Sequence, residues 1–164
     1  RTLVLCGTHR PPGGWRSVPQ RGGGLPDRLH HAFADTRQPG VASLLVGMDT
    51  PQLTPALLRE AMTALGAPGV DAVLGPADDG GWWLLGLREP AHAAVLRTVA
   101  TSTDRTGADT HTALRQRGLR VARLPVLRDV DTAADAHAVA RHCPAHHRFP
   151  RAVATHLPAT TSQP

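Results

Sequence analysis

Residues 41–51 read Val-Ala-Ser-Leu-Leu-Val-Gly-Met-Asp-Thr-Pro, an apolar run that ends in a glycine, a carboxylate and a proline. The run Val41 to Val46 predicts a buried strand, and Asp49 directly follows its carboxyl end. Ligands of open α/β sheets bind outside the carboxyl ends of the strands. We therefore expect the Asp49 carboxylate to hold a divalent cation on a phosphate. The alternative is a turn aspartate, because Asp-Thr-Pro is also common turn chemistry.

A second apolar run, Val121 to Leu127, leads into Arg-Asp-Val-Asp-Thr at residues 128–132. We call residues 47–51 the first acidic turn and residues 128–132 the second acidic turn. Both follow predicted strands, so they can face one ion. In an extended segment Asp129 and Asp131 point to opposite sides, and we choose Asp131 as the partner of Asp49. The alternative for Asp131 is a favourable charge at a helix N-terminus.

Between these turns, residues 75–81 form a glycine-rich acidic loop that leads into a third apolar run. Gly80 and Gly81 lack side chains, so their backbone can approach a ligand closely, and Asp79 beside them is a candidate sugar-binding residue or base. A tight turn that needs positive φ is the competing explanation. Trp82 and Trp83 face opposite sides of the following strand, one towards the core and the other free to stack on a sugar or a base.

Strand and helix patterns alternate along the chain, which predicts an α/β fold with a mostly parallel sheet covered on both faces. From residue 143 onward proline, histidine, serine and threonine dominate, so we expect one domain over residues 1–142 and a flexible tail over 143–164. Residues 7–19 are rich in proline and glycine and predict a loop. The expected strands are 2–6, 41–46, 70–74, 82–87 and 121–127, and the expected helices are 25–36, 54–65, 90–99, 108–117 and 132–142.

Composition narrows the class of partner. The 164 residues are 41% hydrophobic and contain no uninterrupted apolar stretch of ~18 residues, so we expect a soluble domain without a membrane partner. The net charge is +5, but all 18 basic residues are scattered arginines and no aromatic stacking set accompanies them, so we expect no nucleic-acid partner. Cys6 and Cys143 are far apart and no signal peptide precedes them, which favours the cytoplasm.

Five motifs, in order, resemble those of a bacterial family of small GT-A-like glycosyltransferases. That family includes arsenosugar-biosynthesis-type enzymes and is similar to the phospholactate and molybdenum-cofactor guanylyltransferases. The resemblance covers about residues 1 to 140. Its motifs are Gln-Arg-Gly-Gly-Gly-Leu-Pro-Asp-Arg-Leu at residues 20–29, the first acidic turn, the loop at 75–81, Ser102-Thr103 and the second acidic turn.

The resemblance implies a three-layer, Rossmann-like nucleotide-diphospho-sugar transferase fold. It also implies that Asp49 and Asp131 hold Mg²⁺ or Mn²⁺, and that Asp79 acts in catalysis or sugar binding. Trp82 stands where the family usually has tyrosine, which keeps an aromatic face and loses a hydroxyl. The residues implied near the donor nucleotide are Arg21, Gly23, Gly24 and Arg28, and those implied near the sugar or the acceptor are Gly80, Gly81, Trp82, Ser102 and Thr103.

The chain departs from this family at its front. Members begin with a strand and a glycine- and lysine-containing loop that grips the nucleotide, whereas this chain starts at what corresponds to the second strand. Its first residue is Arg1, not methionine. We therefore expect either further sequence upstream or an N-terminally truncated domain.

The leading hypothesis is a metal-dependent glycosyltransferase that uses a nucleotide-diphospho-sugar donor and a small-molecule acceptor. One alternative within the same fold is a guanylyltransferase-like nucleotidyltransferase, which releases pyrophosphate from a nucleoside triphosphate. The other is an inactive truncated domain of this fold.

Overall fold

A four-stranded sheet forms the centre of the computed structural model, which describes residues 1–157. Its strands lie in the order β3 (Ser43–Val46), β5 (Trp82–Leu87), β4 (Ala72–Pro76) and β6 (Val121–Arg123). β4 pairs in parallel with β6, whereas β5 is antiparallel to both β3 and β4. The predicted α/β fold is confirmed, with three strands in one direction and β5 reversed. β5 is reversed because residues 77–81 are too few for a parallel crossover from β4.

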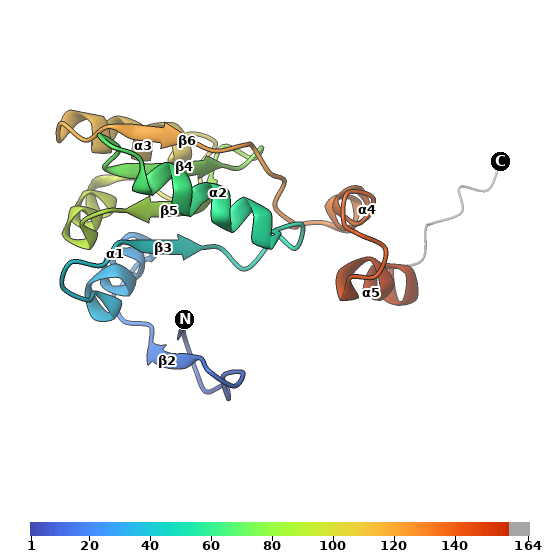
Figure 1. Cartoon of the computed structure of the whole chain (residues 1–164). Helices are drawn as coiled ribbons and strands as arrows, with labels where there is room; N and C mark the ends of the chain where they lie inside the picture. Colours follow the sequence, from blue (N-terminus) through green and yellow to red (C-terminus); the bar gives the residue numbers. More distant parts are fainter. Residues whose placement is uncertain (158–164) are drawn as a thin grey trace.

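Helices cover both faces of this sheet, which gives three layers (Figure 1). Helix α2 (Pro55–Gly66) packs on one face. Helix α1 (Leu25–Thr36), the 3₁₀ helix η1 (Pro90–Thr98) and helix α3 (Thr106–Gln116) pack on the other. Within residues 1–157 no helix has the length and hydropathy of a bilayer span. The buried side chains under α2 include Ala61, Leu65, Val73 and Trp83, and those on the opposite face include Phe33, Leu74, Leu85, Val95 and Leu114.

Local signals in the sequence fix several helix ends. The Thr54 hydroxyl accepts a hydrogen bond from the Leu57 backbone at 3.2 Å, and Pro55 opens the first turn of α2. Gly118 has a φ of +77°, the left-handed conformation that commonly follows a helix, just beyond the end of α3. Thr132 and Asp135 form a capping box at the start of α4 (Ala133–Ala140).

The N-terminal residues form a separate two-stranded parallel sheet of β1 (Thr2–Leu5) and β2 (Arg16–Pro19). The sequence predicted β1, but it predicted a loop where β2 lies. Pairing with β1 defines β2, because the Arg16 N–H donates to the carbonyl of Arg1 at 3.0 Å and the Gln20 N–H to that of Leu5 at 2.8 Å. None of the first 31 residues is buried. In Figure 1 this small sheet lies apart from β3.

The C-terminal segment contains a second helix where a flexible tail was expected. Helix α5 (Arg148–His156) contacts α4, and the pair extends beyond the strand ends (Figure 1). Val139 of α4 and Val153 of α5 are both buried, so this pair has a small apolar contact of its own. Pro150 is tolerated because it lies in the first turn of α5. Residues 158–164, the rest of the expected tail, lie outside the described residues.

Candidate functional site

The two acidic turns meet in front of the strand ends. The Val130 N–H donates a hydrogen bond to the backbone carbonyl of Asp49 at 2.9 Å, and the Gln52 amide donates to the carbonyl of Arg128 at 2.6 Å. β3 and β6 are opposite edges of the sheet. The segment after β6 therefore crosses the strand ends to reach the first acidic turn, and the two turns lie side by side. That their carboxylates share one ion stays a prediction.

Asp129 is the carboxylate of the second acidic turn that faces the others. Its side chain is half-buried, whereas Asp49 and Asp131 are exposed. Burial, followed by the negative charges of Asp49 and Asp79, raises the pKa of Asp129 to about 7. The sequence analysis assumed an extended segment in which only one of Asp129 and Asp131 faces the site, and Asp131 was chosen. The structure has no strand over residues 128–132, so alternation does not force that choice, and Asp131 as a metal ligand stays a prediction.

Buried oxygen atoms without a partner gather at these turns. Five buried side-chain polar atoms in residues 1–157 lack a hydrogen bond, and three of them are Thr50 Oγ1, Gln52 Oε1 and Asp129 Oδ1. Buried polar atoms in folded proteins normally have a partner, so each such atom calls for an explanation. Sequence analysis did not select Thr50 or Gln52, although both lie within three residues of Asp49.

This donor set fits a hard divalent cation. Mg²⁺ and Mn²⁺ prefer oxygen ligands, and the unpartnered atoms of Thr50, Gln52 and Asp129 are all oxygens. Within the described residues no group of three or more His, Cys, Asp or Glu side chains is arranged to hold a metal. Mg²⁺ commonly takes one or two carboxylates and completes its coordination with water and substrate phosphates. The site therefore suits a cation that arrives with a phosphate ligand better than a metal held by the protein alone.

The two aspartates of the glycine-rich loop differ in what they already bind. Asp78 pairs with Arg128 at 2.7 Å, so its charge is compensated. Asp79 accepts a hydrogen bond from the Gly81 N–H at 2.7 Å through Oδ1, which closes a turn typical of aspartate. Asp79 therefore keeps the other carboxylate oxygen for a ligand.

Gly80 is required by the packing of its own loop. Its φ is +93°, and a Cβ at this position would overlap the backbone carbonyl of Asp104. The Gly107 N–H donates to the Gly80 carbonyl at 2.7 Å, which ties the loop to the start of α3. The requirements of the turn therefore explain why residue 80 is glycine. Contact of Gly80 with a sugar stays a prediction. A Cβ at Gly81 would come nearest to the Asp79 carboxylate, at 3.0 Å from Oδ1.

Trp82 and Trp83 face opposite sides of β5, as the sequence predicted. Trp83 is fully buried, and its indole N–H donates to the carbonyl of Pro125 at 3.0 Å. Gly75 makes room for that indole, which a Cβ would overlap. The register of β4 and β5 shifts at Gly75 and Pro76, a bulge of the kind found beside active sites. Trp83 thereby anchors the segment that leads into the second acidic turn, while Trp82 is half-buried against the opposite core.

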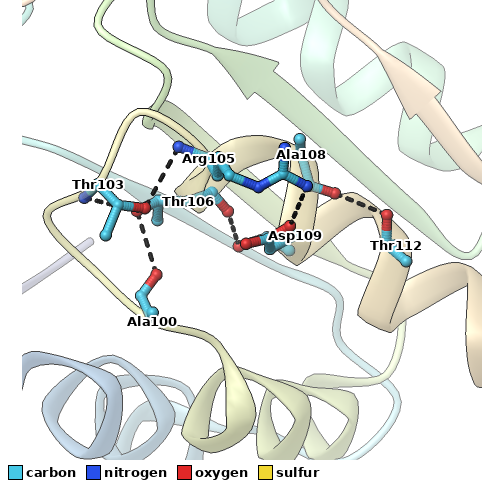
Figure 2. Close-up of polar contacts among 8 residues, drawn as sticks. Ala100, Thr103, Arg105, Thr106, Ala108, Asp109 and Thr112 are labelled. Carbon is cyan, nitrogen blue, oxygen red and sulfur yellow. Dashed lines mark hydrogen bonds and ion pairs between the residues drawn. The ribbon is translucent and has the colours of Figure 1, made fainter.

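Ser102 and Thr103 lie in the loop before α3, and Figure 2 shows the polar contacts of Thr103. The Thr103 hydroxyl accepts from the Arg105 N–H at 3.2 Å and lies 3.3 Å from the hydroxyl of Thr106. Thr106 in turn donates to the carbonyl of Ala100 at 3.1 Å. Ser102 is exposed and has a φ of +59°. Thr103 therefore fixes the start of α3, and contact of either residue with an acceptor stays a prediction.

The candidate nucleotide residues lie around the N-terminus of α1. Arg21 makes two hydrogen bonds of 2.7 Å to Asp35, and Arg28 reaches the carbonyl of Gly22 at 3.4 Å. No hydrogen bond or ion pair in residues 1–157 joins this loop to either acidic turn. Gly24 is the N-cap of α1, and a Cβ at Gly23 would meet open space. The structure does not bring these residues into contact with the acidic turns.

The glycine-rich loop also lines a cavity of about 300 Å³ under the first turns of α3. His111 and Arg123 lie in its wall. No motif in the sequence marked either of them as a candidate site residue. Burial, followed by the positive charge of Arg123, lowers the pKa of His111. His111 is therefore held in its neutral form, which can both donate and accept a hydrogen bond.

Asp129→Asn is expected to raise the free energy of unfolding above pH 7, measured with a chelator present. The pKa of Asp129 is raised from 3.8 to about 7 on folding, so the folded state favours its protonated form. Wild-type stability should therefore fall as the pH rises from 3.8 towards 7. Asparagine is neutral throughout, and we expect a gain of about 1–2 kcal/mol at pH 8 and almost none near pH 4, allowing for partial solvent exposure. Identical pH profiles of the two proteins in urea unfolding would contradict this.

A protein of solved structure has a fold similar to that of this chain. It is described as a "putative nucleotide-diphospho-sugar transferase from Desulfovibrio desulfuricans G20", and the two chains share 30% sequence identity with a TM-score of 0.67. The similarity covers 77% of this chain and 55% of that one, so this chain spans about half the length of its structural relative. No curated protein sequence matches the chain.

A family match covers the N-terminal part of the chain. Residues 5–103 match the family described as "Uncharacterized protein conserved in bacteria (DUF2064)". The matched segment includes the first acidic turn and the glycine-rich loop and ends before the second acidic turn. Because it covers more than half of the 164 residues, the chain belongs to this bacterial family.

Proposed function

We propose that this protein is a metal-dependent glycosyltransferase that binds a nucleotide-diphospho-sugar donor at the two acidic turns. The observation that carries the proposal is the hydrogen bond from the Val130 N–H to the Asp49 carbonyl, which holds carboxylates from two distant segments at one end of the sheet. The similarity to the transferase from Desulfovibrio desulfuricans supports a transferase in general. The proposal adds to this that the transferred group is a glycosyl group and that the reaction depends on a metal.

Electrostatics supports a cation at this position. Burial is the largest cause of the raised pKa of Asp129, and the negative charges of Asp49, Asp79 and Asp131 raise it further, so several carboxylates lie close enough to act on one another. A diphosphate would add more negative charge. A divalent cation held by Asp49 and Asp129 would supply the charge that stabilises the leaving nucleoside diphosphate.

The remaining residues have assignable roles in this proposal. Thr50 and Gln52 offer their buried oxygens to the bound group. Asp79 is the candidate base, with one carboxylate oxygen outside its turn hydrogen bond. In the reaction an acceptor hydroxyl attacks the anomeric carbon, its proton passes to Asp79, and the bond from that carbon to the diphosphate oxygen breaks. Asp131, exposed beside this group, stays a predicted ligand.

The products of the reaction test the proposal. The protein is incubated with UDP- and GDP-sugars, Mn²⁺ and a panel of hydroxyl acceptors, and the nucleotide products are separated by chromatography. We expect release of a nucleoside diphosphate that depends on Mn²⁺. A parallel incubation replaces the sugar nucleotides by nucleoside triphosphates, and release of pyrophosphate there would replace this proposal by nucleotidyl transfer. Absence of any saturable nucleotide binding in calorimetry would favour an inactive domain.

A further inference from the structure

A larger cavity lies beside the second acidic turn, between the sheet and α4. Its volume is about 570 Å³, within the usual range for small-molecule sites. One wall comes from the segment that leads into the second acidic turn, with Val126 and Leu127. The other comes from α4, with Ala138 and Val139. We call this space the α4 cavity.

The α4 cavity has apolar walls and a positively charged rim. The charged or titratable residues that line it are Asp78, Arg128, Arg141 and His142. Asp78 and Arg128 compensate each other at 2.7 Å. In the described part of the chain Arg141 makes no ion pair and no side-chain hydrogen bond. The cavity therefore presents one guanidinium without an anion, next to a histidine.

Charge at this end of α4 would not by itself indicate a site, because a cation near a helix C-terminus is favourable in any protein. The apolar wall is the independent observation. Val126 is 59% exposed, which is high for a branched apolar side chain that lines a cavity. A ligand that covers Val126 and pairs with Arg141 would satisfy both residues at once.

We propose that the α4 cavity binds the acceptor, and that this acceptor is a small organic anion. Its carboxylate or phosphate pairs with Arg141, and its apolar part lies on Val126 and Leu127. The role as acceptor rests on the proposed function, whereas the binding of an organic anion does not. The position suits an acceptor because Arg128 of the second acidic turn and Gln52, which follows the first, both line the cavity, so the cavity adjoins both turns.

Calorimetry with simple probes tests this inference without a donor or a metal. Phenyl phosphate, benzoate and the neutral phenyl glucoside are titrated into the protein in the presence of a chelator. We expect saturable binding of at least one of the two anions and none of the neutral glucoside. The tighter of the two anions then identifies a phosphate or a carboxylate as the preferred head group.

Variants locate the binding. Arg141→Gln is expected to weaken binding of the anionic probe by about tenfold or more, since it removes a charge-assisted hydrogen bond. Arg148→Gln removes the same charge from an exposed position on α5 outside the cavity and should leave the affinity unchanged. Val126→Glu adds a negative charge to the wall and should also abolish binding. Equal affinity of wild type and Arg141→Gln would overturn the proposal, as would equal binding of the neutral glucoside.

The donor site is measured separately. Sugar-nucleotide binding with Mn²⁺ decides the proposed function, and Asp49→Asn should remove it while leaving phenyl phosphate binding intact. Loss of phenyl phosphate binding in Arg141→Gln supports the anion site whether or not a sugar nucleotide binds. Binding of a sugar nucleotide without binding of either anionic probe would overturn the α4 cavity assignment and leave the proposed function standing.

Discussion

Asp49→Asn is expected to weaken Mn²⁺-dependent binding of a sugar nucleotide by about 100-fold or more, because the loss of a direct ligand should cost at least as much as the loss of a residue that only orients one. The substitution keeps the shape of the side chain and removes its charge. The backbone carbonyl of Asp49 still accepts from Val130, so the turn itself should persist. Calorimetry of UDP- and GDP-sugars with and without Mn²⁺ measures the effect.

Matched variants distinguish the ligands of the site. Asp109→Asn removes an exposed ion pair on α3 and should change neither stability nor donor binding by much. Asp129→Asn should reduce donor binding to a similar extent as Asp49→Asn. Asp131→Asn should reduce it less, because Asp129 is the more buried of the two and carries the unpartnered carboxylate oxygen of this turn. A larger loss in Asp131→Asn than in Asp129→Asn would support Asp131, the residue chosen from the sequence, as the ligand from the second acidic turn. Full binding by Asp49→Asn would remove the metal from the proposal.

Gly80→Ala is expected to lower the free energy of unfolding by about 3 kcal/mol. The reason is twofold: a side chain at a φ of +93° is strained, and its Cβ would overlap the Asp104 carbonyl. For a protein of this size that corresponds to a decrease of roughly 10 °C in Tm. Thermal unfolding followed by circular dichroism measures it.

Gly13→Ala is the control for this experiment. A Cβ at Gly13 would meet nothing within 4 Å, and its φ is not in the left-handed region. Its stability should therefore match or slightly exceed that of the wild type. Gly107→Ala should behave like Gly80→Ala, because its Cβ would overlap the Gly81 carbonyl. If Gly80→Ala were as stable as Gly13→Ala, the close packing of the glycine-rich loop on α3 would be wrong.

Short-range patterns explain why much of the fold was predictable. The helix that begins after Thr54, the capping box at Thr132 and the stop at Gly118 each depend on residues within one helical turn. The first acidic turn follows directly from an apolar run. The reversal of β5 was not predicted, although the short link from Pro76 to Trp82 permits only a hairpin.

Features that depend on distant segments were not predictable in this way. β2 is a strand only because β1 offers its edge, and its own residues carry a weak strand pattern. The apolar face of α5 is short, and it is buried only because α4 packs against it. The sequence analysis placed β2 in a loop and α5 in the tail, because the residues of a segment rarely indicate which other segment will pack against it.

The candidate site shows the same division. That Asp49 lies near the second acidic turn follows from where strands end in an α/β sheet. Which aspartate of that turn faces inward depends on the Val130 hydrogen bond and on burial, and neither leaves a local mark. The α4 cavity is more remote still, since its walls come from segments on either side of the second acidic turn. His111 and Arg123 likewise became neighbours only through the packing of α3 on β6.

The small sheet of β1 and β2 has a consequence for how the molecule comes apart. Since none of its side chains is buried, separating it from the rest breaks few apolar contacts, and a two-stranded sheet alone is only marginally stable in water. The first twenty residues can therefore open in partial excursions while the sandwiched layers stay closed. Arg21, Gly23 and Gly24, which are predicted to lie near the donor nucleotide, follow this unit closely in the chain, so they adjoin the part of the protein that is expected to open first.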